Sequence, residues 1–132
     1  GWLVLAALFG SMVFFPIIVA PKVFQALDEK SGGAFLRLLF PGYYAYIIIT
    51  SAIAALCFHS NIVIAIGLVL VSLSTLAVRQ LLVPQINSWR DAELAGDAGA
   101  ATKFARGHRI SVLINLAQMI FIAWSIGSMA LA

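Results

Sequence analysis

Charged residues interrupt the apolar sequence in only two places. Residues 1–21, 38–78 and 110–132 contain no Asp, Glu, Lys or Arg. A helix that crosses a bilayer needs about 20 apolar residues at about 1.5 Å each, so the first and last stretches each have room for one span and the middle stretch for two. The pattern therefore predicts four transmembrane helices.

The middle stretch must reverse direction, and its one polar tripeptide, His59-Ser60-Asn61, lies close to its midpoint. We expect a hairpin there. The sequence predicts an all-α integral membrane four-helix bundle, a single domain over residues 1–132, with helices at about 2–27, 42–58, 62–90 and 99–131. No cationic segment precedes the first helix, so we interpret it as a retained span rather than a signal peptide.

The two charged segments carry their own turn and cap signals. Residues 28–33, with the run Ser-Gly-Gly, indicate a turn, and Pro41 would open the second helix, where its missing N–H has no helical partner. Pro16 removes a backbone hydrogen bond within the first helix and predicts a kink. Asp97 is expected to cap a short helix through Lys103 that leads into the last span.

Composition agrees with a membrane protein. Hydrophobic residues make up 63% of the 132 residues and charged residues 10%, whereas roughly a quarter of the residues of soluble domains are charged. The formal net charge is +3, which loop topology explains better than a nucleic-acid partner does. The single cysteine, Cys57, excludes an internal disulfide.

All basic residues belong to the two charged segments, which four spans place on one side of the bilayer. They are Lys22, Lys30, Arg37, Arg79, Arg90, Lys103, Arg106 and Arg109. By the positive-inside rule that side is the cytoplasm, so the hairpin and both termini are predicted on the non-cytoplasmic side of the inner (plasma) membrane.

The last predicted helix carries a polar stripe at intervals of three and four residues. Its members are His108, Ser111, Asn115, Gln118, Ile122, Ser125 and Met129. Polar groups are costly in contact with lipid, so the stripe is expected to face the bundle and to bond neighbouring helices, with Ser111, Asn115, Gln118 and Ser125 as the interhelical groups. Ala123, Gly127 and Ala130 form a second face of small residues on the same helix.

Several short pieces of the chain occur in an order and spacing that we associate with one family. They are Gly10 through Phe15, Ala20-Pro21, Phe24, Leu39-Phe40-Pro41, Tyr43-Tyr44, Pro84, Ile86-Asn87, Arg90-Asp91, Lys103-Phe104, His108, Ser111 and Asn115-Leu116. On these pieces the chain resembles the transmembrane-protein-205-like proteins over about residues 10–116. The resemblance implies a four-helix membrane domain of unknown function.

More distantly, that family is similar to the copper-resistance membrane domain and to the bacterial membrane protoporphyrinogen oxidase, in which small helical bundles handle copper or haem. The oxidase group uses a histidine near the first helix. Here residues 10–22 contain Met12 and Phe14 but no histidine. The departure argues against transferring a haem site to this chain.

Two sets of residues are candidates for ligand chemistry. His108 stands at the charged mouth of the polar stripe, where a neutral imidazole could ligate haem iron or copper, or could pin the last helix through carbonyl groups. Cys57, His59 and Met129 are all predicted near the opposite leaflet, and sulfur with imidazole suits Cu(I), although cysteine and methionine are ordinary core residues. His59 and His108 lie about 30 Å apart by bilayer thickness, which excludes a bis-histidine haem within one chain.

The sequence contains no recognisable catalytic constellation. The predicted spans contain no carboxylate, which argues against a proton-driven carrier, and no hydrolase, phosphate-loop or dinucleotide motif occurs. The leading hypothesis is a non-enzymatic accessory or stabilising subunit of a larger membrane assembly, whose partners are the lipid bilayer and other membrane subunits. The alternative is a haem- or copper-binding membrane redox protein that uses His108 or the group at Cys57, His59 and Met129.

Overall fold

The computed structural model describes all 132 residues, and nearly all of them are helical. The elements are α1 (Trp2–Phe14), the π-helical turn η1 (Phe15–Val19), α2 (Ala20–Ala26), α3 (Glu29–Cys57), α4 (Ile62–Ala77), the π-helical turn η2 (Val78–Leu82), α5 (Val83–Leu94) and α6 (Ala98–Ala130). Since η1 and η2 join their neighbours without a break, the elements form four long rods, each long and apolar enough to cross a membrane. The predicted all-α class with four spans is confirmed.

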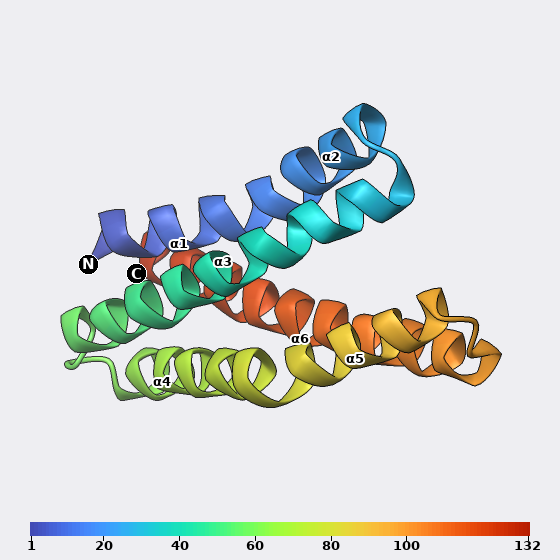
Figure 1. Ribbon diagram of the computed structural model, residues 1–132. Helices are drawn as coiled ribbons and strands as arrows, with labels where there is room; N and C mark the ends of the chain where they lie inside the picture. Colours follow the sequence, from blue (N-terminus) through green and yellow to red (C-terminus); the bar gives the residue numbers. More distant parts are fainter.

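The four rods pack as a closed ring around one apolar core. α3 lies against α1 and α4, and α6 completes the ring by contacting the same two helices (Figure 1). Leu5 and Leu8 of α1, Ile47 of α3, Leu68 of α4 and Ile122 of α6 are all fully buried in this core. Every rod therefore contributes to one continuous interior, which we call the apolar half of the molecule.

The start of α3 differs from the prediction. The helix begins at Glu29 rather than near residue 42, so the segment expected as a turn and Pro41 both lie inside it. The Asp28 carboxylate caps the helix by accepting a hydrogen bond from the Ser31 N–H at 3.1 Å. Hydrogen bonding by the Ser31 side chain, together with this N–H, holds the pKa of Asp28 below its ordinary value. Gly32 is buried against Phe24, since a Cβ there would approach the ring to 2.9 Å. Close packing of α2 on α3 thus overrides the turn signal of the glycines.

Irregular backbone marks the level at which the rods leave the apolar half. Pro16 lies in η1, where a kink was predicted, and Pro84 opens α5 directly after η2. Pro41 has no N–H to donate to the carbonyl of Arg37 within α3. Beyond this level the rods diverge in two pairs (Figure 1). We call residues 20–41 the first arm and residues 83–109 the second arm; together they form the charged half.

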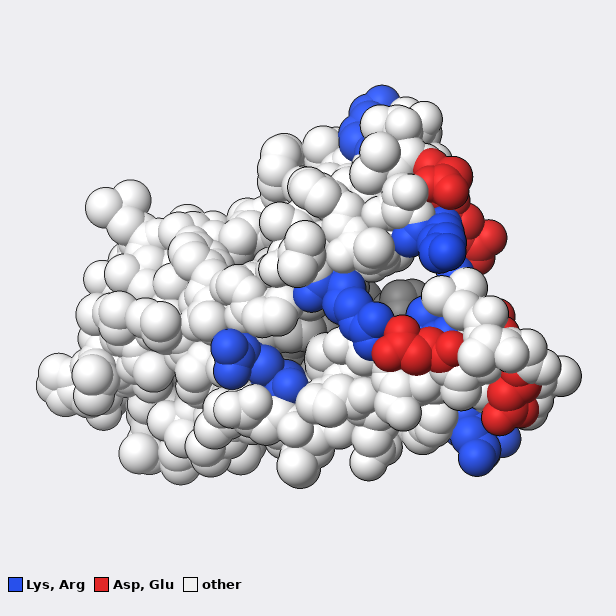
Figure 2. Space-filling model, viewed as in Figure 1, with Lys and Arg blue, Asp and Glu red and all other residues white.

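The connection between α3 and α4 agrees with the predicted hairpin. Residues 58–61 turn between α3 and α4, and the Asn61 side chain caps α4 by accepting from the Ile64 N–H at 3.3 Å. Asp97 caps α6 through the N–H groups of Gly99 and Ala100, but the helix that it starts is continuous to Ala130 rather than short. Both termini lie at the hairpin end of the molecule, and the charged half lies at the other (Figures 1 and 2).

Candidate functional site

The most distinctive polar feature is a set of ion pairs that joins the two arms. Arg37 of the first arm donates two parallel hydrogen bonds to the Asp91 carboxylate of the second, at 2.8 and 3.0 Å. Arg90 donates to Glu93 on its own helix at 2.9 Å and reaches Glu29 of the first arm at 3.4 Å. Figure 2 shows an opening between the arms with charged groups along its edges. We call this set of five residues the clasp: Glu29, Arg37, Arg90, Asp91 and Glu93.

Arg90 occupies the centre of the clasp. Its guanidinium carbon lies 5.3 Å from the centre of the Phe104 ring, and the Phe104 ring in turn stacks on His108 at 6.1 Å with 8° between the planes. The Arg90 side chain is only 22% exposed, whereas Glu29 is 83% and Asp91 60% exposed. Exposed ion pairs contribute about 0–1 kcal/mol each, so the clasp positions the arms more than it stabilises the fold.

Every carboxylate of the chain has an internal role. Asp28 and Asp97 cap helices, and Glu29, Asp91 and Glu93 pair with arginine in the clasp. The basic residues without a carboxylate partner are Lys22, Lys30, Arg79, Lys103, Arg106 and Arg109. Each acidic side chain therefore has a hydrogen-bond partner within the molecule, whereas six of the eight basic side chains have no carboxylate partner.

The apolar half holds one buried polar cluster, centred on Gln118 of α6. The side chain is 7% exposed, and its Nε2 donates to Ser74 Oγ at 2.8 Å and to Thr75 Oγ1 at 3.1 Å, both on α4. Ser72 of α4 makes a further interhelical bond, to the carbonyl oxygen of Ile48 on α3 at 3.0 Å. Side-chain hydrogen bonds thus tie α4 to both of its neighbours.

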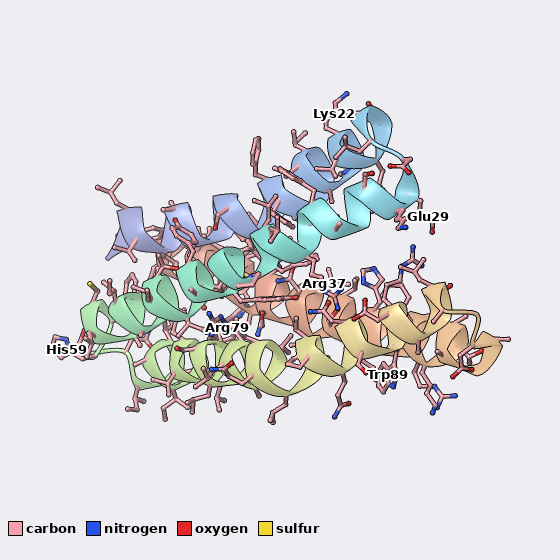
Figure 3. All side chains as sticks on the ribbon, in the orientation of Figure 1. Lys22, Glu29, Arg37, His59, Arg79 and Trp89 are labelled. Carbon is pink, nitrogen blue, oxygen red and sulfur yellow. The ribbon has the colours of Figure 1, made fainter.

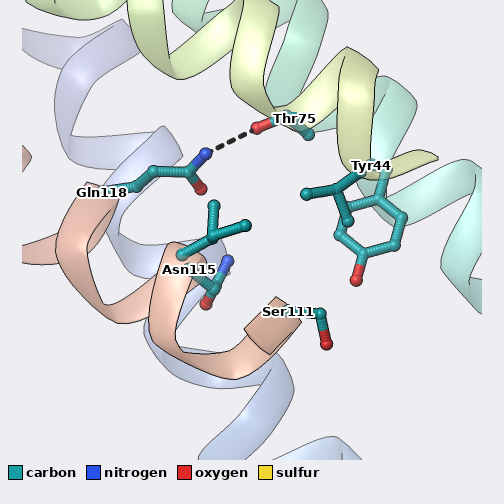
Figure 4. A pocket seen from close by; sticks show the side chains of 7 residues that line it. Tyr44, Thr75, Ser111, Asn115 and Gln118 are labelled. Carbon is teal, nitrogen blue, oxygen red and sulfur yellow. Dashed lines mark hydrogen bonds between the residues drawn. The ribbon is translucent and has the colours of Figure 1, made fainter. Parts of the chain in front are cut away.

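A small cavity lies beside Gln118 (Figure 4). Its volume is about 10 Å³, and it is lined by Tyr44, Thr75, Val78, Ser111, Ile114, Asn115 and Gln118. A volume of this size holds about one water molecule and excludes an organic cofactor. The polar lining suits such a water.

The remaining stripe residues make different contacts. Asn115 Nδ2 lies 3.5 Å from the Tyr43 hydroxyl on α3, at the limit of a hydrogen bond. Ser125 is fully buried but donates to the carbonyl of Phe121 on its own helix, and Ser111 donates likewise to the carbonyl of His108. Of the four residues expected to bond other helices, Gln118 makes the strong contacts, Asn115 a long one, and the two serines bond within α6.

The residues considered for haem or copper lie apart from one another or at the surface. The His108 ring is exposed and makes no hydrogen bond, so its contact to Phe104 takes the place of the expected carbonyl pin. Cys57 and His59 are exposed at the hairpin, where His59 Nδ1 lies 3.0 Å from the Leu56 carbonyl, while Met129 packs against the core. No group of three or more His, Cys, Asp or Glu side chains converges as a metal site would.

An open groove runs between α1 and α3 on the outside of the bundle. It has a volume of about 390 Å³ and is lined by Ser11, Phe14, Phe15, Leu39, Gly42, Tyr43 and Tyr46. The Phe15 and Tyr43 rings stack at 4.3 Å and form one wall of it. The lining is mostly apolar and aromatic, which is compatible with contact to the hydrocarbon chains of a bilayer.

The clasp was not foreseen from the sequence. Arg37 and Asp91 are 54 residues apart and belong to different charged segments, so no spacing rule relates them. The available signal was weaker: both charged segments contain acidic and basic residues. This alone could not show which carboxylate meets which arginine.

Comparison with known proteins gives one match. A family model described as a domain of unknown function (DUF4149) matches residues 3–94, which include α1 through α5 except for the first residue of α1. No curated protein and no solved structure matches the chain. α6, with the polar stripe and three free basic residues, lies outside the matched range.

Proposed function

The chain belongs to the family described as a domain of unknown function (DUF4149), and we propose that it acts as a non-enzymatic accessory subunit of a larger membrane assembly. The resemblance to transmembrane-protein-205-like proteins, made from residues 10–116, is part of this proposal. The apolar half anchors the subunit in the membrane, and the two arms present its polar surface to a partner. The proposed location is the inner (plasma) membrane, with the arms in the cytoplasm.

The observation that carries the proposal is the distribution of charge over the arms. All five carboxylates are engaged within the chain, whereas Lys103, Arg106 and Arg109 are exposed on the second arm at intervals of three residues. Residues three apart lie near one another on a helix surface. They form a basic stripe that complements a partner subunit with an acidic surface, and such complementarity gives specificity and speeds association.

Photo-crosslinking in intact cells tests the proposal. A photoreactive residue at Thr102, exposed beside the basic stripe, is expected to give a discrete protein adduct, whereas the same residue at Leu70, exposed on the apolar half, is expected to crosslink to lipid. Replacing Lys103, Arg106 and Arg109 by Gln should abolish the adduct at Thr102. The matched control replaces Lys22 and Lys30 of the first arm and should leave it intact.

Two results of this experiment contradict the proposal. One is crosslinking to lipid alone at Thr102, which would mean that the basic stripe lies on the membrane surface. The other is an adduct that persists without the three basic residues. An adduct of twice the monomer mass, dependent on the stripe, would identify a second copy of the chain rather than another subunit as the partner.

Sidedness is tested by cysteine labelling. Because native Cys57 is exposed four residues before Asn61, the background must carry Cys57→Ser. An impermeant maleimide added to intact cells should modify Asn61→Cys and spare Glu93→Cys, since the basic residues favour the cytoplasm for the arms. The reverse pattern would place the arms outside and contradict the proposed orientation.

A further inference from the structure

Arg79 is a basic residue at the boundary between the apolar half and the charged half. It lies in η2, and Figure 3 shows it between α3 and the α4–α5 rod, nearer to the apolar half than Arg37 or Glu29. Its Nε donates to the Pro41 carbonyl at 3.2 Å, which fixes the guanidinium group against α3. The two terminal nitrogens form no hydrogen bond to the protein, and no carboxylate lies within 4.0 Å of them.

The depth of Arg79 can be derived from the helix that carries it. Counting from Ile62, where α4 begins, Arg79 is 17 residues along the rod, or about 26 Å at about 1.5 Å per residue. This is close to the thickness of the hydrocarbon core, about 30 Å. In the other three rods the first charge met from the hairpin end is Lys22, Arg37 or Arg109. Arg79 thus lies where hydrocarbon gives way to headgroups.

At that boundary a guanidinium group needs an anion. The protein supplies none, because each of its carboxylates caps a helix or pairs with Arg37 or Arg90. The neighbouring Leu76, one turn away on the same rod, is an exposed apolar side chain. The bond to Pro41 leaves the two terminal N–H groups as a free fork, and this planar arrangement matches two oxygens of a phosphate.

We infer that Arg79 binds the phosphate of an anionic phospholipid at the junction of α3 and η2. The Pro41 carbonyl orients the guanidinium, its terminal nitrogens hold two phosphate oxygens, and the acyl chains lie along the apolar surface that includes Leu76. The site is separate from the basic stripe of the second arm, because it lies at the membrane boundary rather than along α6. It gives the protein a bound lipid in addition to any partner subunit.

Native mass spectrometry of the full chain from detergent tests this inference. The protein is equilibrated with equal amounts of phosphatidylglycerol and phosphatidylcholine, and the retained lipid is counted. Arg79→Gln should lower phosphatidylglycerol retention about fivefold, the factor that one basic residue near an anionic surface contributes. The matched control Lys30→Gln removes an exposed charge at the arm tip and should leave retention unchanged.

A second variant and a competitor complete the test. Arg79→Lys keeps the charge but loses the fork, so retention between the parent and Arg79→Gln supports bidentate binding and carries the test if Arg79→Gln does not fold. Three outcomes overturn the inference: unchanged retention in both Arg79 variants, an equal loss in Lys30→Gln, or displacement of the lipid by millimolar inorganic phosphate. The last would mean that the site takes a free anion rather than a headgroup.

Discussion

The apolar and charged halves are built from the same four rods but are held together by different forces. In the apolar half the rods close into a ring, with fully buried side chains and the bonds of Gln118 to α4. In the charged half the rods separate into two arms, which the exposed ion pairs of the clasp connect (Figures 1 and 2). Stability is therefore concentrated at the apolar end, and the charged end depends on weaker, exposed contacts.

The contact between Gly67 and Phe121 in the apolar half offers the strongest test of this difference. Gly67 of α4 faces the Phe121 ring of α6 so closely that a Cβ would overlap it. Gly67→Ala should destabilise the fold by about 1–3 kcal/mol, because overpacking forces the ring or the helix to move. The free energy of unfolding, measured by dodecyl sulfate titration in mixed micelles, gives the value.

The control for this substitution is Gly127→Ala on α6, where a Cβ would meet nothing within 4 Å. Alanine is the better helix former by about 1 kcal/mol, so this variant should be as stable as the parent or more so. If Gly67→Ala and Gly127→Ala behave alike, the contact between α4 and α6 is looser than the structure has it. That result would contradict the inference that the apolar half is the more stable of the two.

The spans of the fold could be predicted from the sequence because the bilayer imposes a strong rule on charge. The absence of charge over residues 1–21, 38–78 and 110–132 located four helices, and His59-Ser60-Asn61 located the hairpin. The beginning of α3 could not be predicted in the same way. Ser31, Gly32 and Gly33 favour a turn locally, and what makes them helical is the Asp28 cap and the packing of Phe24 on Gly32.

Gln118 provides the next test, also in the apolar half. Gln118→Leu removes the bonds to Ser74 and Thr75, each of which is expected to contribute about 0.6 kcal/mol and at most about 1.7. The predicted loss in the free energy of unfolding is about 1–2 kcal/mol, because Ser74 and Thr75 keep bonds to the carbonyl of Val71 on their own helix.

Two further substitutions on α6 rank the contacts. Asn115→Leu should cost less than Gln118→Leu, since its single contact to Tyr43 is 3.5 Å long. Val112→Leu, at an exposed position off the stripe, should have almost no effect. Equal losses for Gln118→Leu and Val112→Leu in the same titration would show that the polar cluster does not hold the helices together.

The clasp should behave in the opposite way, with a small effect on stability and a large one on geometry. Asp91→Asn removes the charge that faces Arg37, and exposed pairs are worth about 1 kcal/mol or less. The unfolding free energy should therefore change by less than about 1 kcal/mol. Spin labels at Lys30 and Leu94, both exposed near the arm tips, should report a longer and broader distance distribution in pulsed resonance measurements.

Salt provides a check on the same pair without a mutation. Raising the salt concentration screens exposed charges, so it should broaden the distances in the parent and have little effect in Asp91→Asn. An unchanged distribution in Asp91→Asn would mean that the Arg37–Asp91 pair does not set the position of the arms. The proposed difference between the two halves would then not hold for the charged half.

Candidate site residues were harder to predict than spans, for a reason that Gln118 and Arg37 illustrate. The three- and four-residue spacing of the stripe placed Gln118 toward the interior, since periodicity on one helix is a local property. It did not show that Ser111 and Ser125 would bond within α6, because a serine hydroxyl easily reaches a carbonyl of the preceding turn. Pairs such as Arg37 and Asp91 depend on where two rods diverge, which no single-helix pattern contains.

The smallest effect is expected at His108, where the charged half offers its best candidate for ligand chemistry. Its ring is exposed, forms no hydrogen bond and rests on Phe104. His108→Gln removes that stacking and leaves the backbone of α6 intact, so the unfolding free energy should change by less than about 0.5 kcal/mol, as for most surface substitutions.

Glutamine is a poor replacement for imidazole as a ligand of haem iron or copper, so the same variant also separates the two hypotheses for function. Both forms are purified, and their Soret absorbance and copper content are compared. Absence of haem and copper from both forms agrees with an accessory subunit, whereas a stoichiometric cofactor in the parent that is lost from a folded His108→Gln protein would replace that proposal with the redox one.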